Sequence, residues 1–412
     1  MNPPDYICFW PMTRLLIFLP RSVPMRTNNT TSVSIYRRTA VIVAALAALA
    51  STAMAADTAW SDARKERLRA AVRANQAQER LVGVQVAVFH EGSLAFSFNG
   101  GYADLEHQVP VTADTRFEVA SVTKAFTGLG LLLLGETRDI DLDAPIQRYV
   151  ADFPEKAEGQ ITPRMLGGGL GGIRHYSDTE RTPRFYATHY DDVVDAIGLF
   201  KDDSLVASPG EQMVYSSYGY NLLAAVIQGA SASRFQEYIR RAIILPLGLE
   251  NTGHTDVRFP MAERARMYSF LDPYTREASD RLMVVPTMEH SYNAGGGNMY
   301  STAEDLAIFG SQFIAPGFLS QSVYDQIYAP HRTLGGEATW FSDGWVLMAL
   351  GSDPRSLIAG GSYPGVQAIL RVYPDQEMVI ALLTNTWGMN GGEGAFTRQL
   401  SGELAKIVLS VD

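Results

Sequence analysis

Ser121 and Lys124 form a Ser-x-x-Lys pattern whose two side chains suit nucleophilic catalysis. A serine hydroxyl is almost fully protonated near neutral pH, so it needs a base within hydrogen-bond distance before it can attack a carbonyl. Residues three apart on a helix share one face. A lysine there can take the serine's proton if burial or another cation lowers its pKa. The alternative is an ordinary helix start with Ser121 as N-cap and Lys124 exposed to solvent.

Regular elements must hold this pair in place, and the flanking sequence predicts them. An Ala- and Arg-rich helix is expected over Asp57–Gln78, followed by a β-branched, alternating strand over Val82–Phe89 and a returning strand over Leu94–Phe98. Ser121 opens an apolar helix that runs to about Leu134. A helix capped by Ser301 or Thr302 is expected later in the chain.

The distribution of strands predicts an α+β fold with two parts. From 147 to about 289, helical stretches alternate with Gly- and Pro-rich loops, which indicates a mainly helical inserted domain. Strands return near the end, before a last helix. These later elements are Trp345–Leu350, Val366–Val372, Met378–Leu383 and the helix Glu393–Val408. We therefore expect one sheet domain, built from 57–146 and 290–412, with helices flanking its sheet.

The first 55 residues have the pattern of an export signal. Arg37 and Arg38 precede an apolar, alanine-rich run over 39–50, and Ala53-Met54-Ala55 supplies a small-residue cleavage site. We expect 1–55 to be a leader that contains a signal peptide, and the mature protein to be periplasmic or secreted. Our hypothesis is that translation begins at Met25, within this segment. An uncleaved anchor is the alternative, and Sec or Tat export stays open.

Charge and side-chain chemistry exclude several classes of function. The formal net charge is −10 and the predicted leader is basic, so the mature chain is more acidic still. This disfavours nucleic acid or anionic lipid as a partner. The single cysteine, Cys8, lies in the leader, and the seven histidines show no metal-ligand spacing. We expect no metal, no cofactor, no disulfide and no membrane span in the mature protein.

An ordered set of segments resembles the class C β-lactamase, penicillin-binding and esterase family of serine hydrolases. The resemblance covers about Val82 to Val408. It is carried by Gly101–Asp104, Thr115–Phe126 and Leu142–Pro145, and by Gly172–Tyr176 and Tyr215–Leu223, which look closest to the mitochondrial serine β-lactamase-like branch and its bacterial relatives. The resemblance implies a β-lactamase/transpeptidase-like fold: an antiparallel sheet flanked by helices, with the site between the sheet and the helical domain.

The family's second motif falls on Tyr215-Ser216-Ser217. The resemblance makes Tyr215 a proton carrier that acts with Lys124 and Ser121. Ser217 stands where the family usually has an asparagine that binds the substrate's amide, and a serine hydroxyl reaches less far. Tyr218 and Tyr220 are expected to be core residues.

The third motif, usually Lys-Thr-Gly or His-x-Gly, aligns with Ala359-Gly360-Gly361, followed by Ser362. Gly361 keeps the slim strand against which substrate lies, and the amides of Ser121 and Ser362 are the implied oxyanion donors. Ala359 supplies no charge. An arginine from elsewhere can fill this gap, and the candidates are Arg174, Arg332 and Arg355.

A second departure lies at Met165–Gly172, where glycines replace the two histidines and the serine of the family pattern. Such a loop is expected to be looser than its relatives. His175 is expected to be a structural hydrogen bonder, and Gly295–Gly297 a tight structural stretch beside the site.

The sequence thus predicts acyl transfer by Ser121 on small esters, amides or D-amino acid peptides, with β-lactams as further substrates. The expected partner is therefore a small molecule or peptide. The departures at Ala359 and Met165–Gly172 keep two alternatives open: a pseudoenzyme with a binding or assembly role, and a penicillin-binding protein that releases its acyl group slowly.

Overall fold

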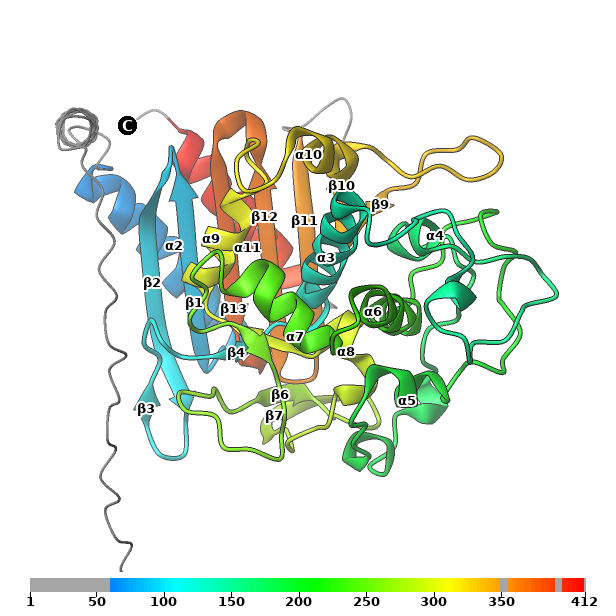
Figure 1. Ribbon diagram of the computed structural model, residues 1–412. Helices are drawn as coiled ribbons and strands as arrows, with labels where there is room; N and C mark the ends of the chain where they lie inside the picture. The colour runs from blue at the N-terminus through cyan, green and yellow to red at the C-terminus, as the bar shows by residue number, and fades with distance from the viewer. Residues whose placement is uncertain (1–59, 349–354, 390–394, 411–412) are drawn as a thin grey trace, which may run out of the picture. The chain divides into compact units, whose positions relative to one another are not determined.

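The computed structural model describes residues 60–348, 355–389 and 395–410 (Figure 1). The predicted leader, Met25 and Cys8 lie outside these residues, so their roles stay predictions. Residues 59–412 form one compact unit by their contacts. No helix within the described ranges is long and apolar enough to cross a membrane.

An eight-stranded antiparallel sheet is the centre of the fold, with strand order β3-β2-β1-β13-β12-β11-β10-β9. Its strands are β1 Gly83–His90, β2 Ser93–Asp104, β3 Val109–Pro110, β9 Phe341–Ser342, β10 Trp345–Met348, β11 Ser356–Tyr363, β12 Val366–Tyr373 and β13 Met378–Thr384. Strand β1, from the first part of the predicted sheet domain, therefore pairs with β13 from its second part.

The sheet is covered on both faces, and its central strands are buried on both (Figure 1). Val84, Val86 and Val88 of β1 pack with Leu68 of α2 and Leu404 of α11. Ala87 of the same strand belongs to the larger core on the opposite face, which includes helices α3, α6 and α9. This two-residue alternation fixes which face each side chain serves.

The α-helices of the described residues surround this sheet or lie in the region beside it (Figure 1). They are α2 Asp62–Glu79, α3 Thr123–Thr137, α4 Pro163–Gly167, α5 Val193–Ile197, α6 Ser217–Ser231, α7 Phe235–Ile239, α8 Ala294–Gly297, α9 Ala303–Ser311, α10 Gln321–Tyr328 and α11 Ala395–Leu409. The sequence offered Ser301 or Thr302 as the N-cap of α9. The N-cap is Thr302, whose side chain accepts a hydrogen bond from Asp305 N.

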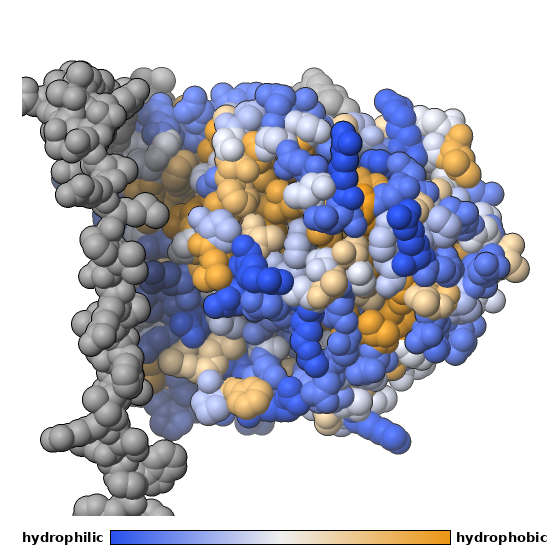
Figure 2. All heavy atoms as spheres, viewed as in Figure 1, coloured by the Kyte–Doolittle hydropathy of each residue, from blue (hydrophilic) through white to orange (hydrophobic). Residues whose placement is uncertain are grey.

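The region 147–289 is less uniformly helical than its sequence suggests. It contains β5 Gly253–His254 and a hairpin of β6 Tyr268–Leu271 and β7 Ala278–Val284. β6 also pairs with β14 Thr386–Trp387, and β5 pairs with β8 Met299–Ser301, which in turn pairs with β4 Phe117–Glu118. On the face seen in Figure 2, hydrophilic side chains predominate and hydrophobic ones form separate patches.

Candidate active site

Ser121 sits at a sharp turn between strand and helix. Strand β4 ends at Glu118, the 3-10 turn η1 spans Ala120–Val122, and α3 begins at Thr123. Ala120 adopts a φ of 46°, a left-handed conformation that side chains other than glycine rarely take. The Thr123 hydroxyl donates to the Ala120 carbonyl at 2.7 Å and holds the turn. Ser121 remains partly accessible.

Lys124 lies one turn further on, with 1% of its surface exposed, and its ammonium group faces Ser121. Its Nζ donates to Ser121 Oγ at 3.1 Å, to Ser217 Oγ at 3.0 Å and to the Gly296 carbonyl at 2.6 Å. These contacts exclude the exposed helix-start alternative for this lysine.

Burial lowers the pKa of Lys124 from 10.5 to about 7, because the charged form loses its hydration. None of the three hydrogen-bond acceptors that the structure describes is a carboxylate, so no described residue at bonding distance offsets that loss with an opposite charge. When Lys124 loses a proton, two N–H groups still serve Ser217 and Gly296, and the lone pair is available to the Ser121 hydroxyl. The pair therefore has the chemistry of a nucleophile and its base.

Tyr215 and Ser217 lie at the start of α6 and both reach Lys124. The Tyr215 ring centroid is 4.9 Å from Lys124 Nζ, and 37% of the residue is exposed. Ser217 is buried, with its hydroxyl on the lysine, and its amide donates to His175 Nδ1 at 3.0 Å. Burial lowers the pKa of His175 to about 3, so this histidine is a neutral acceptor that positions α6.

Tyr218 and Tyr220 are core residues, as expected. Both are buried, and their hydroxyls bond to Glu180 and to the Gly167 carbonyl. Tyr215 is therefore the one tyrosine of this segment that is both exposed and in contact with the lysine.

Strand β11 runs directly against η1. A Cβ added at Gly361 would lie 2.1 Å from the Val119 carbonyl oxygen and 2.7 Å from Ser121 N, so only glycine fits. Ser362 and Ser121 line one cavity. Ala359 is 2% exposed, belongs to the apolar core and does not line that cavity.

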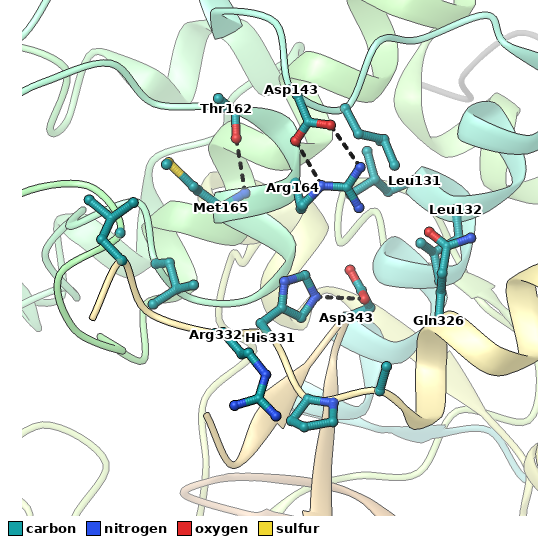
Figure 3. Close-up of a pocket in the computed structure, with 16 residues that line it drawn as sticks. Leu131, Leu132, Asp143, Thr162, Arg164, Met165, Gln326, His331, Arg332 and Asp343 are labelled. Carbon is teal, nitrogen blue, oxygen red and sulfur yellow. Dashed lines mark hydrogen bonds and ion pairs between the residues drawn. The ribbon is translucent and has the colours of Figure 1, made fainter. Parts of the chain in front are cut away.

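The three arginines named as candidates for the missing third-motif cation do not line the Ser121 cavity. Arg174 binds Glu180 and Asp203, and Arg355 binds Asp375. Arg332 lines a different cavity, shown in Figure 3. The residues that do line the Ser121 cavity include Arg181 and Arg276, neither of which carries a sequence motif.

The glycine-rich stretch is closely packed against its neighbours, which gives no support to the expected loosening. A Cβ at Gly167 would lie 2.3 Å from Asp343 Oδ1, and one at Gly168 would lie 2.6 Å from the His331 ring. His331 and Asp343 form a buried pair, with Nε2 2.9 Å from Oδ2 (Figure 3). The glycines thus make room for a histidine–aspartate pair contributed from beyond residue 330.

Gly296 is a site residue that the sequence analysis described only as structural. Its carbonyl accepts the shortest of the three lysine hydrogen bonds, and Gly295 O accepts from Thr127 in the next turn of α3. A run of three glycines signalled a tight backbone but not this contact. Among the described residues, no three His, Cys, Asp or Glu side chains gather as metal ligands.

Sequence comparison shows which known proteins this chain resembles. A family model described as Beta-lactamase matches residues 68–402. The chain belongs to the beta-lactamase family. The expected resemblance and fold class are thereby confirmed.

Members of the beta-lactamase family with similar sequences include the human mitochondrial serine beta-lactamase-like protein LACTB. It is 26% identical over 386 residues, which cover 71% of this chain and 69% of that protein. Penicillin-binding protein 4* of Bacillus subtilis is 26% identical over 308 residues, covering 71% of this chain and 66% of its own length.

Solved structures show the same fold. The octameric penicillin-binding protein homologue from Pyrococcus abyssi has a TM-score of 0.70 at 20% identity, covering 85% of this chain and 78% of that one. The D-amino acid amidase from Ochrobactrum anthropi has a TM-score of 0.68 at 24% identity, covering 83% and 97%. The chain thus has the fold of the beta-lactamase-like serine hydrolases.

Proposed function

We propose that the protein is a serine hydrolase that works through an acyl-enzyme on Ser121, with small esters, amides or D-amino acid peptides as substrates and β-lactams as further ones. The observation that carries the proposal is the buried Lys124 ammonium, 3.1 Å from Ser121 Oγ, with its pKa lowered to about 7 by burial. A substantial share of Lys124 is then uncharged at neutral pH and available as a base.

The steps follow from this geometry. Ser121 Oγ attacks the substrate carbonyl while its proton moves to neutral Lys124, and the backbone amides of Ser121 and Ser362 bind the oxyanion. The proton then passes to the leaving group, with Tyr215 as carrier, and the carbon–leaving group bond breaks. A water molecule attacks the resulting ester and gives up its proton through Lys124, which releases the acid and restores Ser121.

Hydrolysis of p-nitrophenyl acetate and of D-alanine p-nitroanilide by purified protein tests the proposal. Turnover that falls by at least about 10³-fold in Ser121→Ala is the expected result. Equal turnover by wild type and Ser121→Ala would contradict it.

A slowly deacylating penicillin-binding protein is the second candidate. It is favoured by the similarity to penicillin-binding protein 4*. A fluorescent penicillin that labels Ser121 for hours would support this candidate, and rapid loss of the label would support the hydrolase.

Export of the mature chain to the periplasm or beyond is a further part of the proposal. It rests on the basic, apolar and Ala-x-Ala pattern ending at Ala55. Cleavage after Ala55, read by N-terminal sequencing of the exported protein, is the expected result. A cytoplasmic, uncleaved chain would contradict it.

A further inference from the structure

The cavity beside Ser121 is lined by positively charged side chains. Its lining includes Ser121, Ser362, Arg181 and Arg276, and no Asp or Glu among the described residues. Arg181 follows the 3-10 turn Asp178–Glu180 on the helical side, and Arg276 lies in the turn between β6 and β7. Two cations from separate segments thus converge on the nucleophile of an otherwise acidic protein.

Each guanidinium group is held against an aromatic ring. Arg181 Cζ lies 5.2 Å from the ring centroid of Tyr176, and Arg276 Cζ lies 5.2 Å from that of Trp387. The turn that carries Arg276 is itself tied by hydrogen bonds, since the Asp272 carboxylate accepts the amides of Tyr274 and Thr275. These contacts restrict both side chains before any ligand arrives.

Three buried polar atoms on the same lining have no hydrogen-bond partner among the described residues: Tyr363 Oη, His290 Nε2 and Asn293 Oδ1. Burial keeps His290 neutral, with its pKa lowered to about 4, and raises the pKa of Tyr363 well above its usual value. His290 Nδ1 lies 3.3 Å from the Tyr292 hydroxyl. The tautomer in which Tyr292 donates to Nδ1 leaves Nε2–H as a donor. Tyr363 Oη and His290 Nε2 therefore complement an acceptor, whereas the amide oxygen of Asn293 complements a donor.

We propose that Arg181 and Arg276, with the donors of Tyr363 and His290, select substrates that carry a carboxylate near the scissile carbonyl. This inference rests on the proposed function and narrows its substrate class. The two cations are Arg181 on the helical side and Arg276 in the β6–β7 turn. The third-motif position, by contrast, is Ala359, which belongs to the apolar core and carries no charge. The cavity volume of about 30 Å³ suits a carboxylate-sized group.

Two p-nitrophenyl esters of equal acyl length test the proposal: the butyrate, which is neutral, and the hemisuccinate, which ends in a carboxylate. We expect kcat/KM for the hemisuccinate to exceed that for the butyrate by about 10- to 100-fold, as charge-assisted hydrogen bonds predict. Arg181→Gln and Arg276→Gln should each lower this ratio by about 10-fold, and raised salt should lower it further. Arg355→Gln, which removes a guanidinium outside the cavity, is the matched control and should leave it unchanged.

A binding measurement separates this inference from the proposed hydrolysis. Ser121→Ala, which cannot be acylated, should bind monomethyl succinate at least about 10-fold more tightly than methyl butyrate in calorimetry. Adding Arg181→Gln or Arg276→Gln should abolish the difference. Equal binding of the two esters by Ser121→Ala overturns the inference even if the wild type hydrolyses both. Preferential binding without turnover keeps it and overturns only the hydrolase proposal.

Discussion

Lys124 Nζ lies 3.1 Å from Ser121 Oγ, and no carboxylate of the described residues is at hydrogen-bond distance from the lysine. A lysine paired with an acid would stay protonated and could only donate. Here the acceptors are two hydroxyls and a carbonyl, so burial acts on the pKa without an ion-pair partner. This relationship suits Lys124 to the role of base that we propose for it.

The reactivity of Ser121 should therefore follow the titration of Lys124. Because its pKa is lowered from 10.5 to about 7, the reactive deprotonated form grows about tenfold per pH unit below 7 and levels off above it. The second-order rate of inactivation by a neutral fluorophosphonate, measured from pH 5 to 9, should show this inflection. The Lys124→Arg variant keeps the positive charge but does not titrate near neutral pH. Its rate of inactivation should be about 10²- to 10⁴-fold lower than that of the wild type. An inflection near 10, or a flat profile, would rule out the lysine as the base.

Gly361 and Gly360 provide a matched pair of substitutions on one strand. Gly361→Ala would place a Cβ 2.1 Å from the Val119 carbonyl oxygen, whereas a Cβ at Gly360 meets nothing within 4 Å. Gly361→Ala should lower the free energy of unfolding by about 1–3 kcal/mol and reduce Ser121 labelling by at least about 10-fold. Gly360→Ala should change stability by less than about 0.5 kcal/mol. Chemical denaturation and labelling of both variants check this, and equal effects would refute the close approach of β11 to η1.

The packing of Gly167 against Asp343 should appear as coupling between the two positions. Gly167→Ala puts a methyl group 2.3 Å from Asp343 Oδ1 and should destabilise the protein by about 1–3 kcal/mol. Asp343→Ala removes the obstacle, so the double variant should be more stable than the sum of the single effects predicts. Urea denaturation of all four proteins measures the coupling, with the exposed Gly317→Ala as control. Strict additivity would show that the two residues are not in contact.

The His331–Asp343 pair should make stability depend on pH. Burial alone would lower the pKa of His331, but the charge and hydrogen bond of Asp343 outweigh it and raise the pKa above 6.5. The stability that this pair contributes is therefore fully present below pH 6.5 and is lost as pH rises through the raised pKa. Between pH 5.5 and pH 8.5, the free energy of unfolding measured with urea should fall more for the wild type than for His331→Gln. An identical loss in both would contradict the pairing.

Short-range patterns predicted much of the sheet and the contact between Ser121 and Lys124. The alternation of Val82–Phe89 anticipated β1, and the spacing of Ser121 and Lys124 put both on one helical face. Strands β6 and β7 were missed because β6 is only four residues long, and β7 is largely exposed and lacks a regular alternation of polar and apolar residues. Their pairing with β14 is a contact between distant segments.

The partners of each site residue were harder to predict for the same reason. The Gly296 carbonyl, and the His331–Asp343 pair behind the glycines, come from chain segments more than 150 residues away from the positions they contact. Arg181 and Arg276 lie in turns that carry no recognisable motif. The sequence alone therefore offered no reason to choose them over the other arginines as the residues that line the Ser121 cavity. Glycine substitutions that suggest a loosened loop in a sequence accommodate specific side chains in the structure.

Labelling of Ser121 is the most direct test of the central claim. Mature wild-type protein and Ser121→Ala, both shown to be folded by circular dichroism, are incubated with a fluorophosphonate and weighed by intact mass spectrometry. We predict one adduct on the wild type, mapped to Ser121, and none on the variant. A folded wild-type protein without an adduct, or a variant that is labelled as readily, would contradict an activated Ser121.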